Sequence, residues 1–564
     1  MKSRRVKPLQ SVLVCLVLGL AQSTVTFAEV KLVSPNPNVP GLMPSDRFGW
    51  SISISGKTVI VGAPLNKADN LPDAGSAYIF TLTQEGGKGT WKLQAHLNPQ
   101  EAGRRSDKFG YSVSISGDYA VIGAPGVELS TGAVYIYRRD GDGWTQQVKL
   151  MPADGAKRDK FGHAVAILGD SVIVAAHNDD SKAGSVYVYA RNGNRWTQQA
   201  KFTGRDTAKD DNFGSAVALA GGDDSVVDFA IVGAPGHTHN GKQSGAAYIF
   251  VHDGGKWTEE AKLVSADATA SDFFGNAVSV SGFRGTKRYA LIGAPHGPAW
   301  ILNLAQQCNR LCKQSAAYIF SNDGETWTEE AKLTANKPER GEGFGTGVSI
   351  DRNIVLVGVP RHGEGAIEDG ELDAGIVYPF LRDDTRWIRK EARATKKPPE
   401  FPDQNYGQSV AVSPDFIVIG AYGLHRGNPD RGDPGGGAVY IYETRADWGL
   451  RYPVEPALLR PTTLGRIKRT ALFQNFPNPF NPETWLPYHL AADAEVTFRI
   501  YNIQGQLVRQ LDLGAQGADS YQDKESALYW DGRDQVGEAV SSGIYFYHLN
   551  AGDFQATKRM VIVK

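Results

Sequence analysis

The feature of this 564-residue chain that most limits its fold is a unit that recurs seven times. Each unit begins with Phe-Gly or, in the last copy, Tyr-Gly, and successive copies lie 52 to 70 residues apart. The aromatic residues of these pairs are Phe48, Phe109, Phe161, Phe213, Phe274, Phe344 and Tyr406. Such repetition is typical of architectures in which each unit buries its apolar faces against its neighbours. A single unit is therefore not expected to be stable alone.

Every copy predicts four short strands. The first alternates apolar and polar residues, and the third carries two aromatic residues two positions apart, which share one face of a strand and are expected between neighbouring units. The fourth opens with Trp in most copies and runs to Lys-Leu. The second ends near Gly-Ala-Pro, which begins at Gly62, Gly123, Gly233 and Gly293 and is altered at Ala175, Gly358 and Gly420. Four antiparallel strands, seven times over, predict an all-β chain built on a seven-bladed β-propeller.

The N-terminal side of the first Phe-Gly pair carries an isolated strand signal at 30–33. It resembles the end of a fourth strand without the three strands that should precede it. We expect this segment to complete the seventh unit, because closing the ring removes an exposed sheet edge. The alternative is that residues 448–454 fill that place.

Taken together, Phe-Gly, an alternating strand and Gly-Ala-Pro in seven copies resemble the FG-GAP repeats of integrin α subunits and many bacterial surface proteins, over residues 29–445. Those repeats often carry a calcium loop of the form Asp-x-Asp-x-Asp-Gly between their first two strands. Here that place holds short turns such as Gly117-Asp118, which cannot supply the six or more oxygens that calcium takes. The fourth unit alone has a longer acidic connection, with Asp223, Asp224 and Asp228 as candidate ligands. No cofactor is expected to be required, and calcium is disfavoured.

The connections between the second and third strands are long and varied, at 65–74, 296–315, 361–374 and 422–437. They should emerge on the same rim as the connections that lead from one unit to the next, and variable loops on a constant scaffold are typical of a binding surface. We call this end the long-loop rim. Its candidate ligand-binding residues are His237, His296 and the tripeptide Arg431-Gly432-Asp433. The tripeptide resembles an integrin ligand, but its neighbours are turn formers and so short a motif also arises by chance.

An acidic residue stands two positions before the aromatic residue in six of the copies, as at Asp107, Asp159 and Asp211. A catalytic carboxylate is usually unique, whereas one that occurs once per unit is expected to accept hydrogen bonds from the turn that enters the first strand. The chain has no metalloprotease His-Glu-x-x-His, no Gly-x-Ser-x-Gly elbow and no dinucleotide glycine pattern in a fitting context.

The N-terminal 28 residues have the order of a secretory signal peptide: basic residues, an apolar stretch and small residues that end at Ala28. After cleavage only Cys308 and Cys312 would remain, and in an oxidising compartment they could form a local disulfide. Half of a metal site is the alternative, but further ligands are not evident.

The C-terminal part divides into a linker, residues 446–470, and a segment of alternating strands and turns, residues 471–564, that predicts a small β-sandwich. This segment contains Asn-Pro-Phe-Asn-Pro at 478–482 and Trp530-Asp-Gly. It resembles the Ig-like C-terminal sorting domain of type IX secretion substrates and the Ig-like domain of flagellar hook-capping proteins. The resemblance implies a partner in the outer-membrane secretion machinery and a product that is secreted or attached to the cell surface.

Charge excludes one class of partner. The formal net charge is −1 and the basic residues are spread along the chain, so nucleic acid is not expected to bind.

The leading hypothesis is a secreted or cell-surface protein that binds an extracellular protein or polysaccharide, and adheres, through the long-loop rim. The alternative is a secreted propeller enzyme that acts on polysaccharide as a lyase or a hydrolase.

Overall fold

A computed structural model divides the chain into two compact units, Met1–Tyr452 and Pro453–Lys564. It describes residues 30–33, 46–67, 71, 73–85, 88–101, 104–222, 227–253, 255–282, 286–295, 314–335, 342–361, 375–383, 386–390, 405–423, 437–444, 470–476, 478, 480, 482–516, 520–521 and 527–563. Among these residues no helix is long and apolar enough to cross a membrane.

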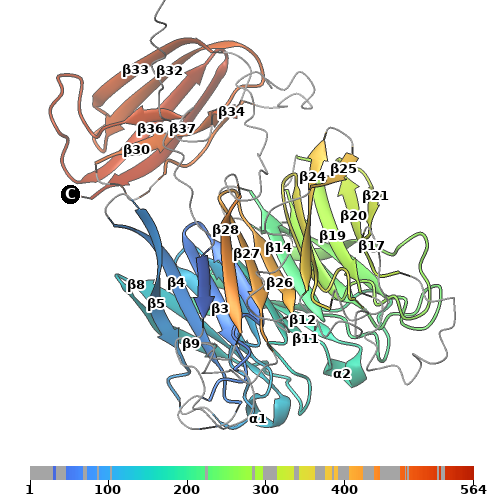
Figure 1. The fold of residues 1–564 in the computed structure, drawn as a ribbon. Coiled ribbons are helices and arrows are strands. Elements are labelled where there is room, and N and C mark those ends of the chain that lie inside the picture. The colour runs from blue at the N-terminus through green and yellow to red at the C-terminus, as the bar shows by residue number, and fades with distance from the viewer. Residues whose placement is uncertain are drawn as a thin grey trace, which may run out of the picture. The chain divides into compact units, whose positions relative to one another are not determined.

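The first unit contains seven four-stranded antiparallel sheets, which are the blades of a propeller (Figure 1). Blade 1 is β2 (Ser51–Ser55), β3 (Thr58–Ala63), β4 (Ser76–Glu85) and β5 (Lys88–Leu97). Blade 2 is β6 (Ser112–Ser116), β7 (Tyr119–Ala124), β8 (Ala133–Asp140) and β9 (Gly143–Leu150). Blade 3 is β10 (Ala164–Leu168), β11 (Ser171–Ala176), β12 (Ser185–Asn192) and β13 (Arg195–Phe202).

The remaining blades follow the same pattern. Blade 4 is β14 (Ala216–Gly221), β15 (Val227–Ala234), β16 (Ala246–Asp253) and β17 (Lys256–Leu263). Blade 5 is β18 (Ala277–Ser281), β19 (Arg288–Ala294), β20 (Ala316–Asn322) and β21 (Trp327–Leu333). Blade 6 is β22 (Gly347–Asp351), β23 (Ile354–Val359), β24 (Ile376–Asp383) and β25 (Arg386–Arg389). Blade 7 is β26 (Tyr406–Val412), β27 (Phe416–Ala421), β28 (Ala438–Glu443) and β1 (Val30–Val33).

The ring closes through its N-terminal strand, as predicted. β1 pairs with β28, with Leu32 opposite Val439, so it is the outermost strand of blade 7. The first strands of successive blades lie side by side in the order β2, β6, β10, β14, β18, β22 and β26, and β26 contacts β2 again. Figure 1 shows blade 7, in orange, beside blade 1, in blue. Residues 448–454, the alternative closing segment, lie outside the described residues.

The aromatic residue of each Phe-Gly pair is fully buried because it fills the space between two blades. The Phe48 ring lies 5.6 Å from Tyr78 and 6.1 Å from Phe80, the two aromatic residues of β4, in edge-on contact. The same core contains Val418 and Val439 of blade 7. Equivalent contacts recur in blades 2 to 5. The predicted aromatic layer between neighbouring blades is therefore confirmed.

The glycines of the repeat allow the blades to approach backbone to backbone. A Cβ atom on Gly62, the first residue of Gly-Ala-Pro in blade 1, would lie 2.0 Å from the carbonyl oxygen of Gly110 in blade 2. Gly110 itself has a φ of +85°, which a side chain rarely adopts. The hydroxyl of Ser51 donates a hydrogen bond of 2.9 Å to the same carbonyl oxygen. Glycine at both places is thus a requirement of blade packing.

Outer strands are joined as well. The Trp indole N–H of β9, β13, β21 and β25 donates to a Gln or Glu side chain on the fourth strand of the preceding blade, at 2.9 to 3.0 Å. Glu330 of β21 accepts the hydrogen bond from the Trp387 indole of β25. Glu330 also binds Lys287 and Arg382. The blades are therefore linked near the axis by backbone contacts and at the periphery by polar side chains.

The second unit forms its own β-structure around a core that contains Phe498, Trp530 and Tyr547. Its main sheet has the order β33 (Leu507–Gln516), β32 (Ala494–Asn502), β36 (Gly543–Ala551) and β37 (Phe554–Ile562). Smaller sheets are formed by β29 (Ala471–Leu472), β31 (Tyr488–His489) and β34 (Ser520–Tyr521), and by β30 (Thr484–Leu486) and β35 (Leu528–Trp530). The predicted small β-domain is confirmed.

Candidate ligand-binding rim

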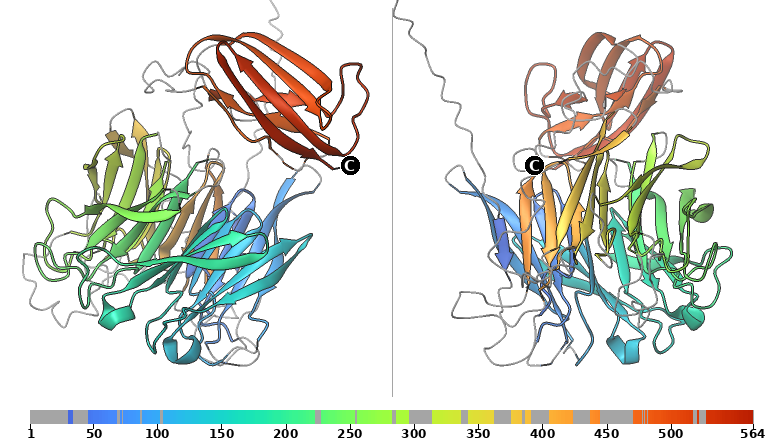
Figure 2. Two further views of the ribbon diagram at one scale, coloured as in Figure 1. Left: turned by 180° about the vertical axis from the view of Figure 1, so that it is seen from behind. Right: turned by 45° about the vertical axis from the view of Figure 1, so that its right-hand side comes forward.

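The long-loop rim is the end of the propeller where second strands finish and first strands begin. Two short helices, α1 (Val127–Ser130) and α2 (Asp179–Lys182), lie in the second-to-third connections of blades 2 and 3 and mark this end in both views of Figure 2. Each contains residues with left-handed backbone, such as Glu128 and Asp180.

Several predicted site residues lie outside the described residues: His296, Arg431, Gly432, Asp433, Asp223, Asp224, Cys308 and Cys312. The signal peptide and the linker lie outside them too. Asp228 is described and belongs to β15. No group of three or more His, Cys, Asp or Glu side chains that could hold a metal ion occurs within the described ranges.

The acidic residues before Phe-Gly act as predicted. In four blades the carboxylate accepts a hydrogen bond from the backbone N–H three residues earlier, which fixes the turn that enters the first strand. The bonds measure 2.7 Å from Arg104 to Asp107, 2.6 Å from Ala156 to Asp159, 2.9 Å from Ala208 to Asp211 and 2.7 Å from Thr269 to Asp272. Burial raises the pKa of Asp107 and Asp159, and these backbone hydrogen bonds partly oppose the rise.

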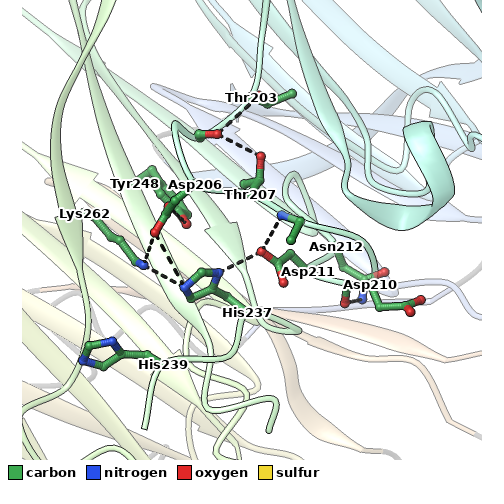
Figure 3. Close-up of polar contacts among 12 residues, drawn as sticks. Thr203, Asp206, Thr207, Asp210, Asp211, Asn212, His237, His239, Tyr248 and Lys262 are labelled. Carbon is green, nitrogen blue, oxygen red and sulfur yellow. Dashed lines mark hydrogen bonds and ion pairs between the residues drawn. The ribbon is translucent and has the colours of Figure 1, made fainter. Parts of the chain in front are cut away.

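His237 belongs to a polar cluster of blade 4 that is mostly buried (Figure 3). Its Nδ1 lies 2.8 Å from Oδ2 of Asp211, and its Nε2 lies 2.7 Å from Nζ of Lys262. Lys262 also donates to Asp206 at 2.6 Å, and the hydroxyl of Tyr248 donates to Asp206 at 2.8 Å. Burial opposes the ionisation of Asp206, but the bonds from Lys262 and Tyr248 outweigh it and lower its pKa.

This cluster is a variant of a lysine–tyrosine–aspartate arrangement that other blades also contain and that we call a structural node. In blades 3 and 5 a fourth-strand lysine lies over the ring of the third-strand tyrosine and donates to an aspartate at 2.6 Å. The His237 side chain is only 8% exposed, and both ring nitrogens have partners. Lys262 occupies the nitrogen that a general base would offer to a substrate. The geometry therefore favours a structural role for His237, and its role in ligand binding stays a prediction.

A second group of residues forms a continuous arc of rings, of which three follow Phe-Gly pairs and two follow the second strand of a blade. The ring contacts run from Tyr422 of blade 7 to Trp50 of blade 1 (5.1 Å between centroids), to Tyr111 of blade 2 (5.5 Å), and to His163 (5.1 Å) and His177 (3.7 Å) of blade 3. We call these five residues the aromatic arc. All five stand where an inner strand meets the long-loop rim, so the arc borders the axis of the propeller at that end.

The rings of the aromatic arc carry no charge at neutral pH. Burial, together with the positive charges of Lys160 and Lys108, lowers the pKa of His163 to about 3. Burial and the neighbouring His163 likewise depress the pKa of His177. Both imidazoles are therefore uncharged at neutral pH and act as aromatic surfaces. Nδ1 of His177 is buried and has no hydrogen-bond partner among the described residues.

Positive charge accompanies the arc. In blades 1 to 3 the residue before Phe-Gly is basic and the residue after it is aromatic, and a backbone hydrogen bond of 3.0 to 3.1 Å closes each turn. The pairs are Arg47 with Trp50, Lys108 with Tyr111, and Lys160 with His163. The Arg47 guanidinium lies 4.9 Å from the centre of the Trp50 ring and 5.5 Å from that of Tyr422.

The other blades present a different chemistry at the same place. The residues after Phe-Gly in blades 4 to 7 are Ser215, Asn276, Thr346 and Gln408. At this place the long-loop rim thus carries aromatic and basic residues in blades 1 to 3, and hydroxyl and amide groups in blades 4 to 7. Sequence reasoning missed these residues because it used the Phe-Gly pairs only as markers of the repeat. A signal was present in the sequence, because the residues that flank Phe-Gly differ between the copies whereas the Phe-Gly turn itself is kept.

Comparison with known proteins agrees with this architecture. The FG-GAP repeat family matches residues 42–80, 91–137, 144–189, 196–250, 257–320, 327–380 and 402–442, which is more than half of the chain. The FlgD Ig-like domain matches residues 484–553. A search of curated proteins found no match.

Three solved structures are similar at low identity. Saccharomyces cerevisiae Sqt1 has 10% identity and a TM-score of 0.34, with 71% of this chain and 97% of that chain covered. The periplasmic gluconolactonase PpgL of Pseudomonas aeruginosa has 14% identity and a TM-score of 0.36, with 63% and 87% covered. The β-propeller domain of the Trilobed protease from Pyrococcus furiosus has 12% identity and a TM-score of 0.35, with 66% and 90% covered. Similarity at this level carries no argument about function. With seven matched repeats over more than half of its length, and seven four-stranded blades, the chain belongs to the FG-GAP repeat family.

Proposed function

We propose that this protein is an exported binding protein that recognises an extracellular polysaccharide with the long-loop rim and thereby adheres to it. The observation that supports this proposal is the partial exposure of Trp50, Tyr111 and Tyr422 in the aromatic arc. The repeat's structural rings, such as Phe48 and Tyr78, are fully buried. Aromatic rings that stay partly exposed on the long-loop rim of a rigid scaffold are suited to contact a ligand.

The side chains on the long-loop rim favour a sugar ligand over a protein surface. Aromatic rings can stack on the apolar faces of sugar rings, and the amide and hydroxyl groups of blades 4 to 7 can hydrogen-bond to sugar hydroxyls. A ligand that contacts both sets of blades would use both kinds of group. A rigid site with a few convergent polar groups is the usual layout of a small-ligand subsite.

Export is part of the same proposal. The signal-peptide pattern of residues 1–28 supports passage out of the cytoplasm. The C-terminal domain matches the FlgD Ig-like domain. Its sequence resemblance to type IX sorting domains supports the proposal that it directs transfer across the outer membrane. Deleting the C-terminal unit should retain the propeller inside the cell envelope, which fractionation of the producing bacterium would detect.

The test of binding is an array of extracellular polysaccharides and matrix proteins probed with the purified chain and with Trp50→Ala. Trp144→Ala is the matched control, because Trp144 lies in β9 on the periphery of blade 2. We expect polysaccharide binding that Trp50→Ala weakens about tenfold, as loss of a stacking residue does, and that Trp144→Ala leaves within about twofold.

Other outcomes would contradict the proposal. Binding that both variants retain would place the ligand elsewhere. Binding to matrix proteins alone would show that the ligand is a protein. Release of shortened sugar chains would favour the enzyme hypothesis over simple binding.

A further inference from the structure

We propose that the ligand of the aromatic arc is an anionic polysaccharide, with carboxylate or sulfate groups on the sugar rings that stack. This inference rests on the proposed function and names the ligand class of the same site. It depends on three basic side chains, Arg47, Lys108 and Lys160, which we call the basic triplet.

The geometry of the turns brings charge and ring together. Each member of the basic triplet stands three residues before a ring of the arc, and the backbone N–H of the aromatic residue donates to the carbonyl oxygen of the basic residue. All three basic residues have left-handed backbone, with φ of 57°, 58° and 59°. The same turn therefore places a basic residue three positions before an aromatic residue in three consecutive blades. A chain of sugar rings that carry negative charges would meet a repeated pattern of the same kind.

The charges of the basic triplet have no ion-pair partner in the part of the propeller that the structure describes. No ion pair involves Arg47, Lys108 or Lys160 among the residues that the structure describes. By contrast, the lysines of the structural nodes, such as Lys201 and Lys332, each bind an aspartate at 2.6 Å. Burial and the charges of Lys108 and Lys182 also lower the pKa of Lys160. An anion placed here would relieve repulsion between like charges.

The partner chemistry follows from this imbalance. A cationic ligand would be repelled by the triplet, and a neutral sugar would leave it unpaired. An anionic sugar can stack on Trp50 and Tyr111 while its acidic group meets Lys108 or Lys160.

The experiment compares three soluble probes by calorimetry on the full chain: polygalacturonate, its carboxyl-reduced neutral form, and dextran sulfate. The variant is Lys108→Gln/Lys160→Gln. The matched control is Lys57→Gln/Lys256→Gln, which removes the same charge from the turns at the opposite rim. Thermal unfolding monitored by circular dichroism verifies that both variants fold.

We expect polygalacturonate or dextran sulfate to bind, and the Lys108→Gln/Lys160→Gln variant to lose about tenfold or more in affinity. The control should stay within about twofold. Polygalacturonate alone would identify carboxylate as the recognised group, and dextran sulfate alone would identify sulfate. In either case Trp50→Ala should also weaken binding, because the proposed ligand stacks.

Three results would overturn the inference. Equal binding of the carboxyl-reduced polymer and polygalacturonate would show that charge is not read. Equal loss of affinity in the Lys108→Gln/Lys160→Gln variant and in the control would show a long-range electrostatic effect without a specific site. Anion binding that Trp50→Ala leaves unchanged would show that no ring stacks. If Trp50→Ala abolishes binding of a neutral polysaccharide, the proposed function stands and only the ligand class fails; if no polysaccharide binds at all, both fail.

Discussion

At the scale of single residues, each Phe-Gly turn combines positions that cannot vary with positions that can. The aromatic residue and the glycine are held by packing between blades, as Phe48 and Gly110 show. The residues on either side of the pair face the rim, and they change from Arg47 and Trp50 in blade 1 to Asn212 and Ser215 in blade 4. Comparison of the seven internal copies thus distinguishes positions that the fold requires from positions that are free to form the proposed ligand site.

Gly62→Ala should destabilise the propeller. The added Cβ would lie 2.0 Å from the carbonyl oxygen of Gly110, so two blades would have to separate. We expect a loss of about 3 kcal/mol in the free energy of unfolding, measured with urea. Gly143→Ala is the control, because a Cβ there would meet its nearest atom at 3.6 Å. Equal stability of the two variants would contradict the backbone contact between blades 1 and 2.

Glu330 should link blades 5 and 6 in a pH-dependent way. Burial opposes ionisation of Glu330, but hydrogen bonds from Lys287 and Arg382 outweigh it and lower its pKa to about 2, from an ordinary 4.5. Since the folded pKa lies below the unfolded pKa, the stabilisation is complete above about pH 4.5 and disappears as the pH falls toward 2. Glu330→Gln should cost about 2 kcal/mol at pH 7 and almost nothing near pH 2. A cost that does not change with pH would contradict this.

At the scale of elements, the sequence predicted the strands well because each has a strong local signal. Alternation, paired aromatic residues and Gly-Ala-Pro mark all seven blades, and the isolated segment at 30–33 closes blade 7 as β1. The site was predicted poorly. The convergence of Tyr422 with Trp50 depends on ring closure, which places residues far apart in the sequence 5.1 Å from each other. The burial of His237 depends on Lys262 and Asp211, which local sequence does not bring together.

The closing strand offers a test at this scale. Leu32 is 7% exposed in the core between blades 7 and 1, whereas its neighbour Val33 is 41% exposed. Leu32→Ala should therefore lower the free energy of unfolding by about 2 to 3 kcal/mol, and Val33→Ala by less than about 0.5 kcal/mol. Differential scanning calorimetry on both variants would measure this. Similar melting temperatures for the two would argue that β1 adds little to ring closure.

At the scale of the whole molecule, the two units are stabilised in different ways. The propeller depends on contacts between blades all round the ring, whereas the C-terminal unit has a core of its own that includes Phe498, Trp530 and Tyr547. The fragment 470–564 should therefore unfold cooperatively by itself, with a transition seen by circular dichroism. A fragment with blade 2 alone, residues 104–150, should show no such transition. A folded single blade would contradict the dependence on neighbours.

The pairing of β1 with β28 has a mechanical consequence. The chain leaves the last blade just after β28, which is flanked on one side by β27 and on the other by β1. A pull on the chain beyond Glu443 would thus load two hydrogen-bonded ladders at once. The final strand cannot peel away like the edge of an open sheet, so tension on the polypeptide tail is resisted by the very segment with which the ring begins.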